Sequence, residues 1–356
     1  MTRKISIAIL SAFISLGAIA QDSSKTTITG SIDAYYRYNF GKAGSSTFNN
    51  ITSFTNSQNS FELGMASLRV DHSIGKVAGT IDLGFGKRAQ EFSYNDGGLT
   101  NNTGTLMQAV KQAYISYSPS SKVKFTAGKW GTHVGYEVVD AYVNRNYSMS
   151  YMFSKGPFFH TGIKADFTTA GKTTFMVGIA NPTDFVSFDN GQKVALAQIA
   201  TATKDDKIKL WLNYVGTFVK GGGSGQQIDL VATGAVASNF SLGYNGSVYL
   251  ASDGDNSASS WGSALYFNYD PKANFGLTLR TEYFSDKKNN FFKLVSPILS
   301  DDIFAATLSA NYKVGAFTLI PEVRMDNGTV DGLFAKSDAT ATKSTFTALV
   351  AAIYKF

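Results

Sequence analysis

The sequence predicts an all-β chain that crosses a membrane as an antiparallel, up-and-down β-barrel of about sixteen strands. Three observations carry this prediction: a two-residue alternation of apolar and polar side chains, connections that alternate between short and long, and an N-terminal export leader. The composition agrees with it, because 13% of the residues are aromatic and only 16% are charged. The chain has no cysteine, which excludes disulfide scaffolds, thiolate metal sites and cysteine nucleophiles.

Residues 1–20 have the features of a cleaved secretory leader. A basic pair at positions 3 and 4 precedes an apolar core, Ile5–Leu16, and an A-x-A cleavage site that ends at Ala20. The apolar run is shorter than the ~20 residues that a spanning helix needs. We therefore expect a mature chain over residues 21–356. Its formal net charge falls from +6 to +4, too little for a nucleic-acid-binding protein without a Lys/Arg cluster.

The first predicted strand, residues 26–40, sets the pattern for the rest of the chain. Ile28, Ile32 and Tyr36 share one face, while Asp33 and Arg37 lie on the other. Such alternation is the period of a β-strand. The segment is also long for a soluble strand, which usually has ~5–6 residues.

The same period continues to the last residue and marks sixteen strands. They cover residues 26–40, 60–73, 76–87, 107–118, 122–130, 157–168, 172–181, 192–203, 206–219, 226–237, 239–252, 259–270, 273–285, 301–313, 316–327 and 342–356. No helical period interrupts them after the leader.

Connections of one to three residues alternate with much longer ones. The long ones cover residues 41–59, 88–106, 131–156, 182–191, 220–225, 253–258, 286–300 and 328–341. A transmembrane barrel has tight periplasmic turns at one rim and long extracellular loops at the other. A β-sandwich or a propeller has no reason to alternate connection lengths in this way, so the barrel is preferred.

The apolar face of these strands is expected to point outward, toward lipid. The opposite face carries too many charges to be the packed interior of a soluble barrel, and membrane barrels place polar residues in the lumen. Aromatic residues near strand ends agree with interfacial girdles. They are Tyr36, Tyr38, Phe40, Trp261, Tyr269, Tyr283, Tyr354 and Phe356.

The last strand ends on Phe356, with Tyr354 two residues earlier on the same face. An aromatic C-terminal strand of this kind resembles the signal that the outer-membrane barrel-assembly machinery reads. That machinery, membrane lipid and lipopolysaccharide are therefore expected partners.

The longest connection, residues 131–156, is too apolar for a loop in water. It carries four tyrosines together with Met152 and Phe153, and so much apolar surface calls for a partner. Sixteen-stranded barrels enclose an aqueous channel, into which this connection can fold as a constriction. The alternatives are an outward cap, or further strand over residues 146–154 that would raise the count to eighteen.

Two stretches in this region resemble the OmpL-like β-barrel porins of Gram-negative outer membranes. They are Gly128–Glu137 (GKWGTHVGYE) and Asn146–Lys164 (NYSMSYMFSKGPFFHTGIK), and Asn59–Gly86 is similar to the early strands of that family. The distinctive motifs cover about the first half of the mature chain. The resemblance implies an outer-membrane porin, and it gives neither a substrate nor assigned site residues.

The strand register predicts a lumen with balanced charge. Inward cations are Arg37, Lys124, Lys164, Lys209, Arg280 and Arg324, and inward anions are Asp33, Asp82, Asp166, Asp229, Glu282 and Glu322. Opposite charges across a water-filled lumen favour small polar solutes. With this balance we expect weak ion selectivity, with the net charge of +4 favouring anions.

Further candidate constriction residues lie in the longest connection and just after it. They are His133, Glu137, Asp140, Arg145, Lys155 and His160. Any single charge of the luminal face can instead be a solvated residue without a tuned role, and His133 can be a hydrogen-bonded packing residue.

Catalytic and cofactor motifs are weak throughout. The three histidines, His72, His133 and His160, match no zinc spacing. Gly222–Gly225 fails the G-x-S-x-G pattern of esterases, and Asp253–Asn256 starts like a calcium loop without its later Gly and Glu. The sequence therefore predicts no enzyme, no cofactor and no metal.

Passive diffusion of small hydrophilic solutes or ions through the barrel is the function that these features favour. One alternative is a barrel closed by its loop that serves binding or adhesion. Another is an enzyme at the membrane interface, which would depend on His133 or His160. A homo-oligomer is compatible with each of them.

Overall fold

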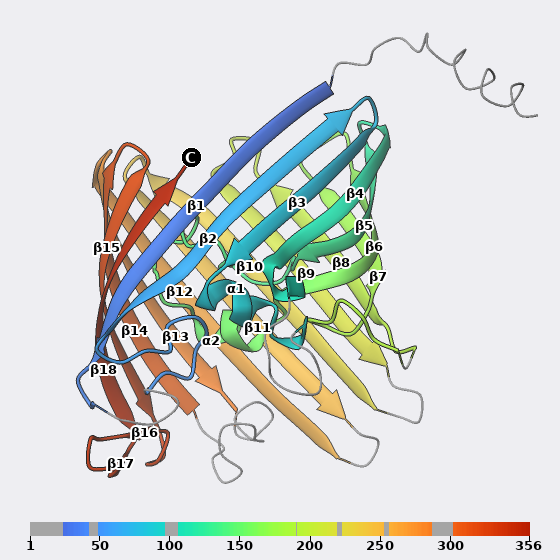
Figure 1. Ribbon diagram of the computed structural model, residues 1–356. Helices are drawn as coiled ribbons and strands as arrows, with labels where there is room; N and C mark the ends of the chain where they lie inside the picture. Colours follow the sequence, from blue (N-terminus) through green and yellow to red (C-terminus); the bar gives the residue numbers. More distant parts are fainter. Residues whose placement is uncertain are drawn as a thin grey trace, which may run out of the picture.

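The computed structural model describes residues 24–42, 49–96, 106–189, 191–218, 223–252, 256–286 and 302–356. The predicted leader, residues 1–20, lies outside these ranges. Where the chain is described, it forms one closed antiparallel barrel of sixteen strands with a small hairpin beside it (Figure 1).

The barrel strands follow the predicted alternation closely. They are β1 (Ser24–Asn39), β2 (Ser60–Ile74), β3 (Val77–Phe85), β4 (Val110–Ser120), β5 (Val123–Gly131), β6 (Phe159–Thr168), β7 (Thr174–Ala180), β8 (Val194–Ala202), β9 (Ile208–Phe218), β10 (Ser224–Ala237), β11 (Phe240–Ser252), β12 (Ser257–Lys272), β13 (Phe275–Ser285), β14 (Asp302–Val314), β15 (Phe317–Gly328) and β18 (Ser344–Lys355).

Neighbours in sequence are neighbours in the wall, and β1 pairs with β18 to close it. Arg37 lies opposite Leu349 across this seam, and Asp33 lies opposite Ile353. The remaining two strands, β16 (Phe334–Ala335) and β17 (Ala341–Thr342), pair only with each other in the last long connection. The prediction of sixteen wall strands is thus confirmed.

Short helices occur in the long connections, which the sequence patterns did not predict. They are α1 (Lys87–Phe92), α2 (Tyr151–Lys155), and the 3-10 turns η1 (Tyr94–Asp96) and η2 (Leu106–Ala109). Because α2 occupies residues 151–155, the alternative of extra strand over 146–154 is wrong. Among the described residues no helix is long and apolar enough to span a bilayer.

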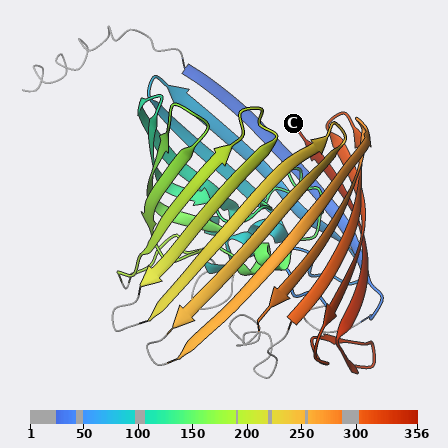
Figure 2. The same ribbon diagram turned by 180° about the vertical axis from the view of Figure 1, so that it is seen from behind.

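The wall is uneven in height. Strands β3 to β7 have 9, 11, 9, 10 and 7 residues, whereas β10 to β12 have 14, 13 and 16. Figures 1 and 2 show the longer strands on the side opposite to β3–β7, with α1 and α2 between the two walls.

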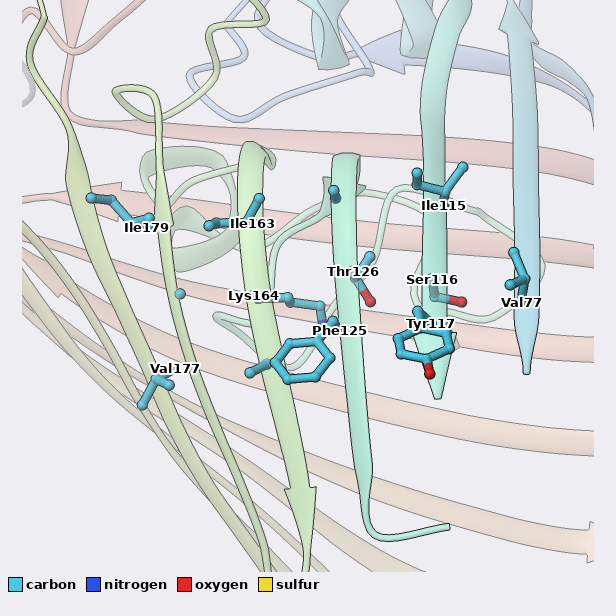
Figure 3. A pocket seen from close by; sticks show the side chains of 13 residues that line it. Val77, Ile115, Ser116, Tyr117, Phe125, Thr126, Ile163, Lys164, Val177 and Ile179 are labelled. Carbon is cyan, nitrogen blue, oxygen red and sulfur yellow. The ribbon is translucent and has the colours of Figure 1, made fainter. Parts of the chain in front are cut away.

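Apolar side chains cover the outside of the barrel, as predicted. Ile115 is 66% exposed and Ile163 is 59% exposed, although both lie in the middle of their strands. Figure 3 shows them with Val177 and Ile179 along a groove of about 710 Å³ on the outer face of β3–β7. Exposed apolar surface of this extent is stable only against lipid or protein.

Candidate functional site

Residues 131–156 run through the lumen and are called the luminal segment below. The stretch Asn146–Tyr151 at its centre is 5% exposed or less at every residue. Only its end is helical, in α2, which packs against β11, β12 and β13. Most of its backbone N–H and C=O groups therefore have no helix or sheet to pair with, and buried backbone groups need hydrogen-bond partners.

Carboxylates on the wall accept hydrogen bonds from the N–H groups of the segment. Glu322 of β15 receives the Tyr147 N–H at 2.7 Å and the Ser148 N–H at 3.1 Å. Glu282 of β13 receives the Tyr151 N–H at 2.7 Å. Charged acceptors make the stronger hydrogen bonds, so these glutamates fix the path of the chain across the lumen.

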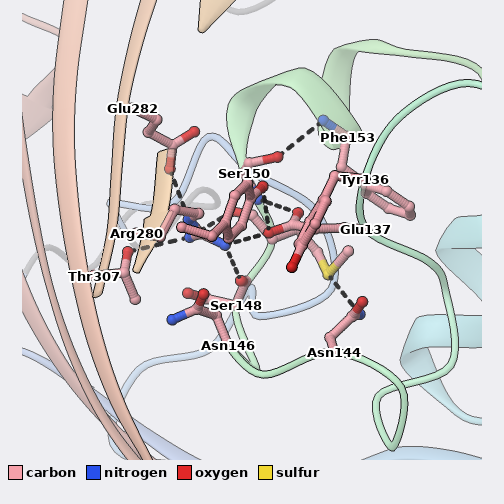
Figure 4. Close-up of polar contacts among 12 residues, drawn as sticks. Tyr136, Glu137, Asn144, Asn146, Ser148, Ser150, Phe153, Arg280, Glu282 and Thr307 are labelled. Atoms are coloured by element: carbon pink, nitrogen blue, oxygen red, sulfur yellow. Dashed lines mark hydrogen bonds and ion pairs between the residues drawn. The ribbon is translucent and has the colours of Figure 1, made fainter. Parts of the chain in front are cut away.

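Arginines on the wall donate to its carbonyl groups. Arg280 of β13 donates to the Ser148 carbonyl at 2.7 Å, as Figure 4 shows, and to Met149 at 3.3 Å. Arg324 of β15 donates to the same Met149 carbonyl at 2.7 Å. The planar fork of a guanidinium can hold several oxygens in this way while staying charged.

Ion pairs join these groups into one buried network. Arg280 lies 2.6 Å from Glu137 of the luminal segment and 3.3 Å from Glu282. Arg324 in turn lies 3.3 Å from Glu282 and 2.7 Å from Asp326. Each of these five groups thus lies within 3.3 Å of an opposite charge, as buried charges need a partner.

Two further ion pairs hold the segment at other points of the wall. Lys111 of β4 lies 2.6 Å from Asp140 of the segment and 3.1 Å from Asp82 of β3. Arg145 of the segment lies 2.6 Å from Asp270 of β12. The luminal segment is therefore tied to opposite sides of the barrel.

Two aromatic side chains and the guanidinium group of an arginine fill the space beside the network. Arg88 of α1 is fully buried, with its guanidinium 4.8 Å from the Phe54 ring centre and 4.7 Å from that of Tyr147. The Tyr147 hydroxyl donates to Asp33 of β1 at 2.5 Å. Burial and the neighbouring carboxylate keep the pKa of Tyr147 well above its usual value, so the hydroxyl remains a donor.

Close approach of the segment to the wall depends on small wall residues. Gly243 of β11 is one, because a Cβ there would lie 2.7 Å from the ring of Tyr136. That ring stacks on Tyr266 of β12 with centroids 4.1 Å apart. A larger residue at position 243 would push Tyr136 off the wall.

His133 and His160 meet on the other side, with ring centroids 5.4 Å apart. The Nε2 of His133 lies 3.2 Å from the Tyr214 carbonyl of β9, and the Nε2 of His160 lies 3.1 Å from the Thr132 hydroxyl. Burial lowers the pKa of His133 to about 4. His133 is therefore neutral near pH 7, and its Nε2–H donates to the carbonyl.

Comparison with protein families gives a match over nearly all of the described chain. The family described as "Putative beta-barrel porin-2, OmpL-like" matches residues 25–356. The chain belongs to this family. It is an outer-membrane porin, a passive route for small hydrophilic solutes through a barrel that contacts lipid.

Solved porin structures share the fold of this porin at low sequence identity. A loop L8 deletion mutant of OmpT from Vibrio cholerae is 11% identical with a TM-score of 0.60, covering 94% of this chain and 100% of its own. The outer membrane channel DcaP of Acinetobacter baumannii is 14% identical with a TM-score of 0.59, covering 94% and 98%. An anion-selective porin from Comamonas acidovorans is 12% identical with a TM-score of 0.60, covering 94% and 100%. No curated protein sequence matches the chain.

The residues expected to line the pore fall into separate groups in this porin. Glu137, Arg280, Glu282, Glu322 and Arg324 come together in the buried network. They contact the backbone of the luminal segment and are 6% exposed or less, so they do not face open water.

Others hold different parts of the chain. Arg37 donates to the Ser57 carbonyl at 2.5 Å and so anchors the first long connection. Lys155 ends α2 half-buried, and its burial lowers the pKa of its ammonium. Lys124, Lys164 and Asp166 lie nearer the short turns, where Lys164 and Asp166 pair at 3.0 Å.

Several residues of the network were not among the predicted site residues. Lys111 is the clearest case, because a register shift between Asp82 and Leu83 opposite β4 breaks the simple alternation there. A bulge moves side chains from one face to the other. Asp326 follows Arg324 at the two-residue spacing of the other charge pairs, so that spacing could have identified it. Nothing in the sequence around Arg88 indicates that this arginine is buried.

Burial extends around the whole inner wall. Every barrel strand has a side chain that is 5% exposed or less, and these sixteen residues are called the belt. They are Asp33, Met65, Asp82, Lys111, Trp130, His160, Met176, Leu196, Asn213, Asp229, Asn245, Tyr266, Arg280, Thr307, Glu322 and Leu349.

Proposed function

We propose that the luminal segment controls passage through this porin by closing the lumen at the belt. The belt itself supports this most directly. A water path along the inner wall would expose inward side chains over the full length of at least one strand. Among the described residues each of the sixteen strands has a belt position that is 5% exposed or less.

Conduction then requires the segment to move away from part of the wall. Its ties are hydrogen bonds and ion pairs, such as Glu137–Arg280 at 2.6 Å and Asp140–Lys111 at 2.6 Å, and such ties are reversible once water enters. The strand ladders do not depend on them, so the barrel can stay intact while the segment shifts. Small hydrophilic solutes are the class that a polar lumen admits.

Single-channel conductance in planar bilayers tests this proposal. One variant replaces residues 134–155 with a short Gly/Ser linker. A matched control replaces residues 331–342, which include the separate β16–β17 hairpin. We expect brief, small openings from the natural protein and the control, and a large steady conductance from the variant without the segment. Equal conductance from all three, with far-UV circular dichroism showing folded barrels, would overturn the proposal.

A second candidate function is favoured by the same belt: a permanently closed barrel whose surface serves binding or adhesion. It predicts that the natural protein never conducts at any applied voltage, while removal of the segment opens the pore. The conductance experiment therefore separates the two candidates. A catalytic role receives less support, because His133 and His160 are occupied in packing.

Export and assembly follow from the two ends of the sequence. We propose cleavage of the leader after Ala20 and recognition of the aromatic β18 strand by the barrel-assembly machinery. Mass spectrometry of the protein purified from outer membranes would check the first, and Phe356→Ala would be expected to lower the folded yield.

A further inference from the structure

Lysines gather inside the barrel at the end that carries the short turns. This end is periplasmic in a membrane barrel, and the space inside it, below the belt, is called the vestibule here. Five strands each contribute one exposed lysine close to their turn end: Lys25 (β1), Lys124 (β5), Lys209 (β9), Lys313 (β14) and Lys355 (β18).

The strand register places these side chains on the inner face. Lys209 and Asn213 lie an even number of residues apart on β9, so their side chains point to the same face of the strand. Asn213 donates a hydrogen bond to Asp229, which faces inward, so Lys209 faces inward too. Lys355 lies opposite the buried Ser31, and its ammonium lies 5.6 Å from the ring centre of Tyr142 in the luminal segment. Lys313 borders a small cavity together with Tyr142.

The acidic residues inside the vestibule are already paired with other cations. Asp71 lies 2.7 Å from Arg69, and Asp166 lies 3.0 Å from Lys164. Asp270 lies 2.6 Å from Arg145 of the luminal segment. Within the described part of the chain, therefore, no ion pair neutralises any of the five lysines.

A group of unneutralised cations inside the mouth of a barrel acts on ions beyond contact distance. The low-dielectric wall focuses the field into the water it encloses. Screening reduces that field over a Debye length of ~8 Å at physiological ionic strength. The five lysines are exposed, so their ammonium groups are in contact with the water of the vestibule.

We propose that the vestibule collects small anions, and that anionic solutes are the class this porin prefers. The transport of those anions rests on the proposed function. Their collection in the vestibule does not, because it does not require the luminal segment to move. A large polyanion is not expected to bind, since the lysines face one another across the inside of the barrel. The preference should weaken at high salt, where the Debye length falls to ~3 Å at 1 M.

Trp211 provides a probe inside the vestibule. It lies on β9 two residues from Lys209 on the same face and is partly exposed. Trp130 is 5% exposed, and Trp261 lies on the outer face at 47% exposure. A Trp261→Phe background therefore leaves Trp211 as the tryptophan that aqueous quenchers can reach.

Quenching of Trp211 fluorescence in the Trp261→Phe background by iodide, caesium and acrylamide tests anion collection without a current measurement. We expect iodide to quench several-fold better than caesium at low salt. Changing Lys124, Lys209 and Lys313 together to glutamine should lower iodide quenching at least about twofold and leave acrylamide unchanged. A control with Lys42, Lys336 and Lys343 changed to glutamine removes the same charge from the opposite end and should behave like the parent. Equal quenching by iodide and caesium, or no response to the vestibule substitutions, would overturn the proposal.

Reversal potentials in a KCl gradient test the transport side, using the variant without residues 134–155. An anion preference that falls with the vestibule substitutions supports the inference, and a cation preference contradicts it. Absence of current from this variant counts against the proposed function, while the quenching result still decides whether the vestibule collects anions.

Discussion

The buried network and the vestibule each contain an arginine and an aspartate two residues apart on one strand. Arg69 and Asp71 lie two residues apart on the inner face of β2, and Arg324 and Asp326 do the same on β15. The first pair has side chains that are 33% and 38% exposed, whereas both side chains of the second are 7% exposed. What distinguishes the pairs is the luminal segment, which covers β15 and leaves the turn end of β2 in water.

Burial changes what such a pair does. In the vestibule the pair is solvated, its charges screen each other, and exposed pairs contribute little to stability. In the buried network the same groups must also satisfy the backbone of the segment, as Arg324 does for the Met149 carbonyl. A buried charge without its partner is costly, so a substitution should matter far more in the buried network than in the vestibule.

The largest effect is expected from Arg280→Gln. The change leaves Glu137 without a compensating cation and leaves Glu282 with Arg324 alone. Breaking a buried pair costs ~3–5 kcal/mol. The segment should detach, exposing Ser309, which Asn146 now covers with a hydrogen bond of 2.7 Å. A Ser309→Cys background reports this, because the chain has no other cysteine. We expect slow thiol labelling in the background alone and fast labelling with Arg280→Gln.

Arg69→Gln is the matched control, since it removes an arginine from the exposed pair in the vestibule. It should leave the labelling rate of Ser309→Cys unchanged. Comparable acceleration by both substitutions would show that the network does not hold the segment.

Glu322→Gln should have the next largest effect. The amide keeps one acceptor oxygen but turns a donor toward the Tyr147 and Ser148 N–H groups, which now bond the two carboxylate oxygens. Leaving a buried donor unsatisfied costs ~1–3 kcal/mol. Hydrogen exchange at these two amides should accelerate by at least about tenfold, while amides in the β9–β10 ladder keep their rates. Unchanged exchange at both amides would contradict this role.

Gly64→Ala should loosen the segment through sterics alone. A Cβ at this position of β2 would collide with the Asp33 carboxylate and the Tyr147 hydroxyl. Overpacking of this kind costs ~1–3 kcal/mol. Gly79→Ala on β3 is the control, because its Cβ would meet nothing within 4 Å. Thiol labelling of Ser309→Cys should be faster with the first substitution only.

Acid should weaken the hold of the segment through His133. Its pKa is lowered from 6.5 to about 4 by burial, so below pH 6.5 the released segment binds a proton that the packed one does not. The packed state then loses about 1.4 kcal/mol for each pH unit between 6.5 and 4. Conductance should rise over this range in the natural protein and rise less in His133→Gln. Identical profiles would exclude His133 as the cause.

The smallest effect is expected from Lys164→Gln in the vestibule. Lys164 pairs with Asp166 at 3.0 Å with side chains 19% and 29% exposed, and pairs near water contribute ~0–1 kcal/mol. Thermal unfolding of the barrel should therefore be nearly unchanged. A destabilisation as large as that of Arg280→Gln would remove the contrast between vestibule and belt.

The sequence by itself determined the wall of this protein. Strand length, the two-residue period and the alternation of short and long connections are local properties, and they predicted the sixteen strands and the outward apolar face correctly. The bulge at Lys111 of β4 marks the limit of this reasoning, because one extra residue changes which side chains face inward.

Only the tertiary structure decided which inward charges are buried. Arg69–Asp71, Lys164–Asp166 and Arg324–Asp326 have the same spacing, and no local pattern separates them. The difference arises because residues 131–156 contact strands more than a hundred positions away, as in the Tyr147–Glu322 bond. Contacts over such distances depend on the closed barrel, which brings β1, β4 and β15 around one segment.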